Sequence, residues 1–201
     1  MNTIFLMQMG NPAMRELIAH STRTALYTFY LATELTGKTR GAPGHDRCDP
    51  QLLALAALFH DIGKLVVPEN ILEKPQRLTS EEFRIIQTHT VAGAAMISRT
   101  MVNVPLAAKQ TMEDICRFHH ERWDGSGYPE GRKGEEIPFG ARIVAICDAY
   151  DAMVHDRAYS RARSHESARA IISEGRGALF DSYLADVFLS LPSRLLMICP
   201  A

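Results

Sequence analysis

Helix start and stop signals recur along the chain and separate its apolar segments. Asn11-Pro12 and Asp49-Pro50 each combine an N-cap side chain with a proline at the first helical position. Thr79 and Glu82 have the spacing of a capping box before a run with helical apolar periodicity. The same rules predict seven helices, over residues 12–36, 50–63, 80–97, 105–121 and 139–155, after Ser164, and from about Asp181.

Strand signals are missing from this pattern, because no segment alternates apolar and polar residues over a sustained stretch. Two loops rich in Gly and Pro, residues 37–49 and 122–138, each join helices of one apolar set. With 201 residues, 46% of them hydrophobic, the chain can bury one full core. We therefore predict a single all-α domain over residues 1–201, a bundle of about seven helices with no significant sheet.

Charge and cysteine content exclude several classes of protein. Lys plus Arg is 22 and Asp plus Glu is 23, so no overall charge attracts a nucleic acid polymer or an anionic membrane. The four cysteines have no CxxC spacing, which favours a reducing, cytoplasmic compartment over a disulfide scaffold or a zinc knuckle. The apolar N-terminus has no Lys or Arg before Arg15 and is too short for a span, so we expect neither a signal peptide nor membrane insertion.

Two polar groups on predicted helices have spacings that suit metal binding. Glu16 and His20 are four residues apart and share a helical face; alone, this spacing fits a surface pair better than a ligand pair. His60 and Asp61 follow eight apolar residues, so we expect a buried helix whose polar end enters the interior. A metal would compensate the buried carboxylate, and Lys64 is placed to hold a phosphate. The alternative is a helix end with a lysine favoured by the helix dipole.

Three further helices carry candidate ligands. His89 lies inside the third predicted helix and alone indicates little. His119 and His120 end the fourth helix and point about 100° apart. Asp148 lies within an apolar helix, with Asp151 three residues later on the same face; a solvated carboxylate is the alternative reading.

Together these residues exceed what one ion can bind. Their number fits two or three divalent ions that share a carboxylate. Nitrogen and oxygen donors without a thiolate favour iron, manganese, nickel or cobalt over a structural zinc, and we expect iron or manganese first, with nickel, cobalt or zinc as alternatives. Paired ions about 3.5–4 Å apart generate a hydroxide and clamp both oxygens of an in-line phosphoryl displacement. The set therefore predicts phosphoester hydrolysis. The seven candidates are His20, His60, Asp61, His89, His119, His120 and Asp148, with Glu16 as an eighth.

A glycine-rich loop, HHERWDGSGYP over residues 119–129, begins with the paired histidines. Its glycines permit tight turns, and Tyr128 is placed to hydrogen-bond to a substrate or stack on it. An ordinary helix connection with an aromatic plug is the alternative. Further on, Arg157 and Arg161 flank Tyr159 and would grip phosphate or form a solvated basic turn.

In order along the chain, these motifs resemble the HD-GYP subgroup of the HD-domain metal-dependent phosphohydrolases over about residues 14–190. The matching runs are HDIGK from His60, PENILEKP, LTSEEF, the His89 helix, HHERWDGSGYP, IPFGARIVAICDAYDAM and GALFD from Gly177. The resemblance implies an all-helical HD fold and hydrolysis of the second messenger cyclic di-GMP to linear pGpG, often on to GMP. A second hypothesis is a catalytically weak signalling module whose GYP loop binds either cyclic di-GMP or a partner protein, a diguanylate cyclase. A third is an HD hydrolase that acts on another nucleotide.

The resemblance also implies roles for single residues. It assigns the seven candidates above to metal binding, with Asp61 bridging two ions and Glu16 serving a third. Lys64 matches a lysine that contacts the scissile phosphate, and Tyr128 belongs to the GYP motif. We expect Asp61 and Lys64 to be catalytic, in a reaction where bridged metals activate water for in-line attack.

The implied substrate contacts lie near the second half of the chain. Asp151 and Arg157 match positions near the bound nucleotide. The usual RPY-plus-basic stretch reads Arg-Ala-Tyr-Ser over residues 157–160, so Arg161 is the candidate for the missing basic residue. The FDP motif reads Phe-Asp-Ser over residues 180–182.

Overall fold

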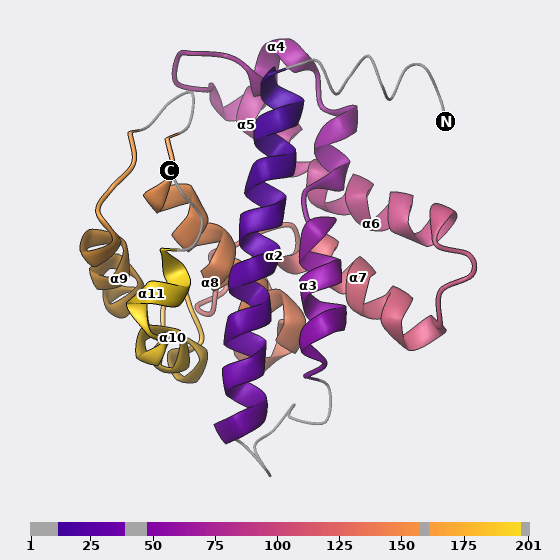
Figure 1. The fold of residues 1–201 in the computed structure, drawn as a ribbon. Coiled ribbons are helices and arrows are strands. Elements are labelled where there is room, and N and C mark those ends of the chain that lie inside the picture. Colours follow the sequence, from indigo (N-terminus) through magenta and orange to yellow (C-terminus); the bar gives the residue numbers. More distant parts are fainter. Residues whose placement is uncertain (1–11, 39–47, 157–160, 198–201) are drawn as a thin grey trace.

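The computed structural model describes residues 12–38, 48–156 and 161–197, and these are mostly helical (Figure 1). No strand forms among the described residues, where Arg176 and Phe180 make a single bridge. The prediction of an all-α fold is confirmed. The helices are α2 (Pro12–Lys38), α3 (Pro50–Leu58), α4 (Glu69–Leu72), α5 (Ser80–Gln87), α6 (His89–Thr100), α7 (Leu106–Phe118), α8 (Phe139–Val154), α9 (His165–Glu174), α10 (Ser182–Ser190) and α11 (Ser193–Leu196), with 3₁₀ helices η2 (Ile62–Val66) and η3 (Gly134–Glu136).

The longest helix, α2, runs through the middle of the molecule. In Figure 1, α3, α6 and α7 lie on one side of it, and α9, α10 and α11 lie on the other. Helix α2 packs against both α3 and α8, and α6 packs against α7 and η2. This arrangement joins the segments that carry the candidate ligands around the first half of α2. Within the described ranges, no helix has the length and apolarity that crossing a bilayer requires.

Side-chain caps start several helices where the sequence predicts them. The Asp49 carboxylate accepts hydrogen bonds from the amides of residues 51 and 52, and Thr79 and Glu82 form the expected capping box. Ser164 caps α9 and Asp181 caps α10 in the same way. Asn11, the predicted cap of the first helix, lies outside the described residues.

Two predicted helices differ from the observed ones. The second ends at Leu58 instead of Gly63, because the chain turns tightly there. In this turn the His60 Nδ1 atom donates a hydrogen bond to the Ala57 carbonyl at 2.7 Å. Its burial is also partial, since Leu55 is 47% exposed. The third predicted helix is two helices, α5 and α6, divided at Thr88.

The division at Thr88 has a local cause. The side chains of Thr88, His89 and Thr90 hydrogen-bond to carbonyls three residues earlier, at 2.6, 2.7 and 2.9 Å. Side chains that bond to nearby carbonyls compete with the main-chain ladder and bend or end a helix. The break makes His89 the first residue of α6 and fixes its ring.

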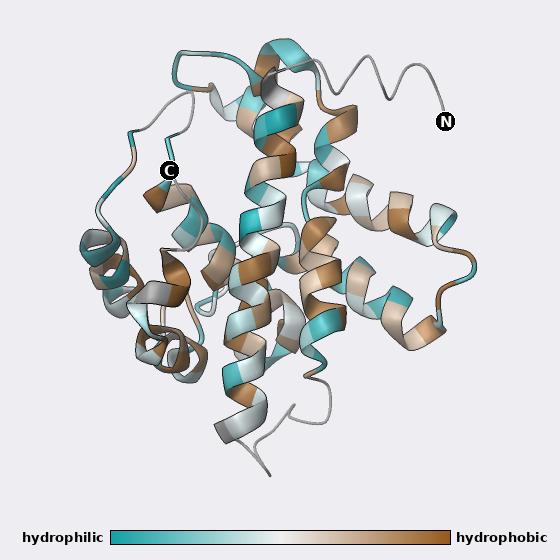
Figure 2. Ribbon diagram, in the orientation of Figure 1, coloured by the Kyte–Doolittle hydropathy of each residue, from teal (hydrophilic) through white to brown (hydrophobic). Residues whose placement is uncertain are grey.

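The core lies where α2, α8 and α10 meet. Tyr150 of α8 packs edge to face on Tyr27 of α2 and Phe188 of α10, with ring centroids 5.2 and 5.1 Å apart. All three side chains are fully buried. Figure 2 shows hydrophobic colouring over most of α3, whose Leu53 also reaches this core. The apolar core thus supports α2 and α8 directly behind their polar residues.

Candidate metal centre

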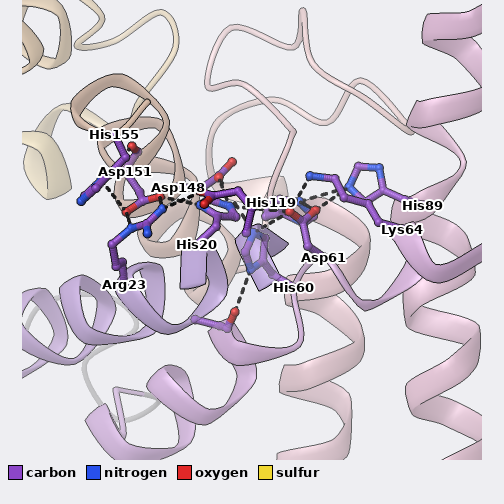
Figure 3. Close-up of polar contacts among 12 residues, drawn as sticks. His20, Arg23, His60, Asp61, Lys64, His89, His119, Asp148, Asp151 and His155 are labelled. Carbon is purple, nitrogen blue, oxygen red and sulfur yellow. Dashed lines mark hydrogen bonds and ion pairs between the residues drawn. The ribbon is translucent and has the colours of Figure 1, made fainter. Parts of the chain in front are cut away.

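Asp61 lies at the centre of a buried cluster of imidazoles (Figure 3). It follows α3 in the turn that leads into η2. His89 begins α6, and His119 is the C-cap residue of α7. His20 comes from α2, and its Nε2 atom lies 3.0 Å from Oδ1 of Asp148, which comes from α8. The fold therefore gathers onto one spot residues that are up to 128 positions apart in sequence.

The donor atoms form two groups that share Asp61. The first group consists of His20, His60 and Asp61, and the second group consists of Asp61, His89, His119 and His120. Within each group all ligand atoms lie within 4.8 Å of one another. Asp148 adjoins the first group, since its Oδ1 is 3.9 Å from His60 Nε2. One carboxylate common to two groups is the arrangement that a bridged pair of ions requires.

Three histidines are oriented by their own main chain. The Nδ1 atoms of His60, His89 and His119 lie 2.7, 2.7 and 3.1 Å from carbonyl oxygens three residues earlier. Because a carbonyl only accepts, each Nδ1 carries the proton, and each Nε2 presents a lone pair. His89 Nε2 is 3.2 Å and His119 Nε2 3.8 Å from Asp61 Oδ1. Imidazoles fixed in this way are preorganised metal ligands.

Some buried polar atoms of the cluster have no hydrogen-bond partner among the described residues, which bears on whether metal ions fit there. His60 Nε2 and Asp61 Oδ1 are fully buried and make no hydrogen bond to any described residue. A buried polar atom without a partner costs about 1–3 kcal/mol, more when it is charged. Divalent ions bound by both groups would satisfy these atoms and balance the carboxylates. The residues present therefore fit the ions that the donor set indicates.

Burial and neighbouring charges set the protonation of the cluster. Burial raises the pKa of Asp61, but the Lys64 ammonium and His60 outweigh it and hold that pKa well below the usual range. Burial lowers the pKa of His120 to about 4, and burial together with the charge of His120 lowers that of His119. Burial also lowers the pKa of His20, but hydrogen bonds to Asp148 and Asp151 raise it to about 9. His119 and His120 of the second group are thus neutral imidazoles at pH 7.

Lys64 and Tyr128 border the cluster from two sides. The Lys64 ammonium is 2.6 Å from Asp61 Oδ2, and its side chain remains 22% exposed. The Tyr128 ring stacks on His120, with centroids 4.8 Å apart, and meets Phe83 edge to face. The sequence predicts both residues at the site, and the structure brings both there.

The loop that carries Tyr128 is held by a buried carboxylate. Glu121 is only 3% exposed and accepts hydrogen bonds from the amides of Glu130 and Arg132, at 2.8 and 3.1 Å. The Tyr128 amide donates to the His120 carbonyl at 3.2 Å. A Cβ at Gly127 would lie 2.4–2.5 Å from main-chain atoms of residues 120–122, so only glycine permits this approach. Sequence reasoning missed Glu121, although its place directly after the paired histidines was a signal.

The remaining predicted residues that the structure describes lie outside the two ligand groups. Glu16 is exposed and lies outside both groups, with Oε1 accepting from Arg23 at 3.0 Å. Asp151 is fully buried and accepts from His20 Nδ1 at 2.6 Å, so it faces a ligand rather than the surface. Arg161 is exposed and belongs to neither group. Arg157 lies outside the described residues.

Comparisons with known proteins identify a family and several relatives. A family model described as HD domain matches residues 17–184. The chain is 41% identical over 174 residues to a probable cyclic di-GMP phosphodiesterase of Vibrio cholerae, covering 85% of this chain and 39% of that protein. It is 34% identical over 175 residues to 3'3'-cGAMP-specific phosphodiesterase 2 of the same organism, covering 87% of this chain and 31% of that protein. The chain thus spans less than two fifths of either relative.

A solved structure shows the same fold. Bd1817, described as an HDG"Y"P protein from Bdellovibrio bacteriovorus, aligns with a TM-score of 0.64 at 19% identity. The alignment covers 86% of this chain and 51% of that one. At this identity the likeness establishes the arrangement of helices, and the site must be argued from its own residues.

Proposed function

Because the chain belongs to the HD-domain family, and within it to the HD-GYP group, we propose that it is a metal-dependent phosphodiesterase that hydrolyses cyclic di-GMP. The product is linear pGpG, with GMP as a further product. The single observation that carries the proposal is the pair of ligand groups that share Asp61. With ions bound, the two groups that share Asp61 would supply a water of lowered pKa and contacts to the oxygens of a phosphodiester.

The chain's own residues prepare this chemistry. The three histidines oriented by main-chain carbonyls present their Nε2 atoms as ligands without rearrangement. His20, Asp148 and Glu16 are the proposed additional ligands, of which Glu16 would have to leave Arg23 to take part. All proposed ligands are nitrogen or oxygen, which favours iron or manganese.

Lys64 supplies a fixed positive charge at the edge of the centre. Its ammonium lies against Asp61 and is partly exposed, so it can contact a phosphate that approaches from solvent. A preorganised cation stabilises the negative charge that develops on the phosphoryl oxygens. We therefore assign Lys64 to the scissile phosphate.

Tyr128 and Arg161 are the proposed contacts to the rest of the nucleotide. The Tyr128 ring is already packed on His120, so it can guide a base or sugar next to the metal ligands. Arg161 is exposed, which leaves its guanidinium free to reach a second phosphate. For Arg157, the proposed contact to the nucleotide rests on the sequence motif alone. Because cyclic di-GMP is an intracellular messenger, we place the enzyme in the cytoplasm.

The test is turnover of cyclic di-GMP by anaerobically purified protein, with metal content measured on the same sample. Asp61→Ala removes the shared ligand, so we expect loss of turnover together with loss of bound metal. Full activity with metal retained in this variant would refute the assignment. A parallel assay with 3'3'-cGAMP identifies the substrate class: preferential cleavage of cyclic GMP-AMP would replace cyclic di-GMP in the proposal.

A further inference from the structure

His20 differs from the other buried histidines in what orients its ring. Its Nδ1 lies 2.6 Å from Asp151 Oδ2, on another helix and 131 residues away. Its Nε2 lies 3.6 Å from Asp61 Oδ2. A carboxylate at Nδ1 fixes that nitrogen as the donor and leaves Nε2, once it has lost its proton, as the atom that faces the first group. On its Nδ1 side, the His20 ring is therefore oriented by Asp151, which can be replaced without changing a candidate ligand.

Asp151 is itself held in place by a guanidinium. Arg23 donates from Nε to Asp151 Oδ1 at 2.7 Å and from Nη2 to Asp151 Oδ2 at 3.1 Å, so the contact is bidentate. His155 Nδ1 lies 3.1 Å from the same Oδ1. Asp151 has no exposed surface, and a buried carboxylate needs compensation of this kind. Figure 3 shows Arg23, Asp151 and His20 as a row of contacting side chains that leads toward Asp61.

Arg23 is well placed for this contact because of helix geometry. It follows His20 by three residues on α2, so both side chains lie on the same helical face and point toward α8. Its guanidinium also holds Glu16 at 3.0 Å, which ties the first turns of α2 to the same pair. The planar, always charged guanidinium suits a bidentate contact that lysine cannot reproduce.

We propose that Asp151, clamped by Arg23, is the positioning residue for His20 and thereby sets the metal affinity of the first group. Asp151 acts through His20 and does not contact the nucleotide. The proposal rests on the metal centre of the proposed function, and on no property of its substrate. Loss of a carboxylate that orients a metal-binding histidine typically weakens metal affinity by about 10–100-fold.

The experiment is a titration of metal-free protein with Mn²⁺, followed by calorimetry, for wild type and for Asp151→Asn. The variant keeps the shape of the side chain but places an amide where two donors converge, which favours the wrong tautomer of His20. We expect one class of Mn²⁺ sites to weaken by about 10–100-fold while the other class, from the second group, keeps its affinity. Asp186→Asn is the matched control, because it removes the carboxylate of another Arg–Asp pair, Arg176–Asp186, on the surface.

Four outcomes decide between this proposal and its alternatives. Wild-type Mn²⁺ affinity at every site in Asp151→Asn overturns the proposal, and a raised KM for cyclic di-GMP with unchanged Mn²⁺ affinity assigns Asp151 to nucleotide binding instead. If Asp151→Asn does not fold, Arg23→Lys decides, because it keeps the charge and loses the bidentate contact; unchanged affinity there also overturns the proposal. A wild type that binds Mn²⁺ but cleaves no cyclic dinucleotide refutes only the proposed function, and the Mn²⁺ affinities still decide this inference.

Discussion

The close approach of η2 to α6 makes Gly63 the sharpest test of how the metal centre is built. A Cβ at this position would lie 1.9 Å from the His89 carbonyl oxygen and 2.5 Å from the Gly93 nitrogen. Carbon and oxygen atoms normally approach to about 3.3 Å, so in Gly63→Ala the two segments must separate by about 1.4 Å. Asp61 immediately precedes η2 and His89 begins α6, so the separation acts on the 3.2 Å contact between their donor atoms.

Both stability and activity of Gly63→Ala should fall. Overpacking of this kind costs about 3 kcal/mol, which for a chain of this size lowers Tm by about 6–12 °C. A displacement of about 1 Å in a catalytic constellation costs about 100-fold in rate. The measurements are thermal denaturation of the metal-free protein and turnover of the metal-loaded protein.

A matched substitution separates this effect from the intrinsic effect of adding a methyl group. Gly37 lies in the last turn of α2, and a Cβ added there would meet nothing within 4 Å, so Gly37→Ala should be neutral or stabilise by up to about 1 kcal/mol. If Gly63→Ala shows the Tm and turnover of wild type, the close approach does not constrain the centre and the reasoning is wrong.

Two further predictions concern charge at the centre. Lys64→Ala should keep the bound metal and lose about 10²–10³-fold in kcat; metal analysis beside steady-state kinetics checks this, and unchanged kinetics would remove Lys64 from the mechanism. Because hydrogen bonds to Asp148 and Asp151 raise the pKa of His20 to about 9, the first group must release a proton from His20 when it binds an ion at pH 7. Its affinity should therefore rise by about tenfold per unit between pH 6 and pH 8, with one proton released. Calorimetry in buffers of different ionisation enthalpy measures that release, and an affinity of the first group that does not change with pH would contradict the assignment.

Local signals account for the parts of the fold that the sequence predicts well. The caps at Asp49, Thr79, Ser164 and Asp181 act within three residues, so the starts of their helices can be found without tertiary information. The candidate histidine ligands can also be found from the sequence, because several histidines within or at the ends of apolar helices are counted together. The sequence does not indicate the division of the helix at Thr88. There, three consecutive side chains hydrogen-bond to main-chain carbonyls three residues earlier.

Contacts between distant segments are the part that sequence reasoning missed. The family resemblance places Asp151 near the nucleotide and gives no sign of its contact with Arg23, which is 128 residues away. No spacing rule connects two such residues, since the contact exists only when α2 packs on α8. The same is true of Gly63, whose requirement for glycine comes from α6 and not from its own turn.

Because His60, His89 and His119 are each anchored to the peptide backbone three positions earlier, the identity of neighbouring side chains has little influence on their ring orientation. Surface residues around the centre can therefore change while the inner constellation stays intact. Such a division lets substrate preference diversify by substitution at the rim, without each new specificity having to rebuild the reactive core. It also makes the scaffold a practical starting point for redesign, provided that α3, α6 and α7 keep their turns.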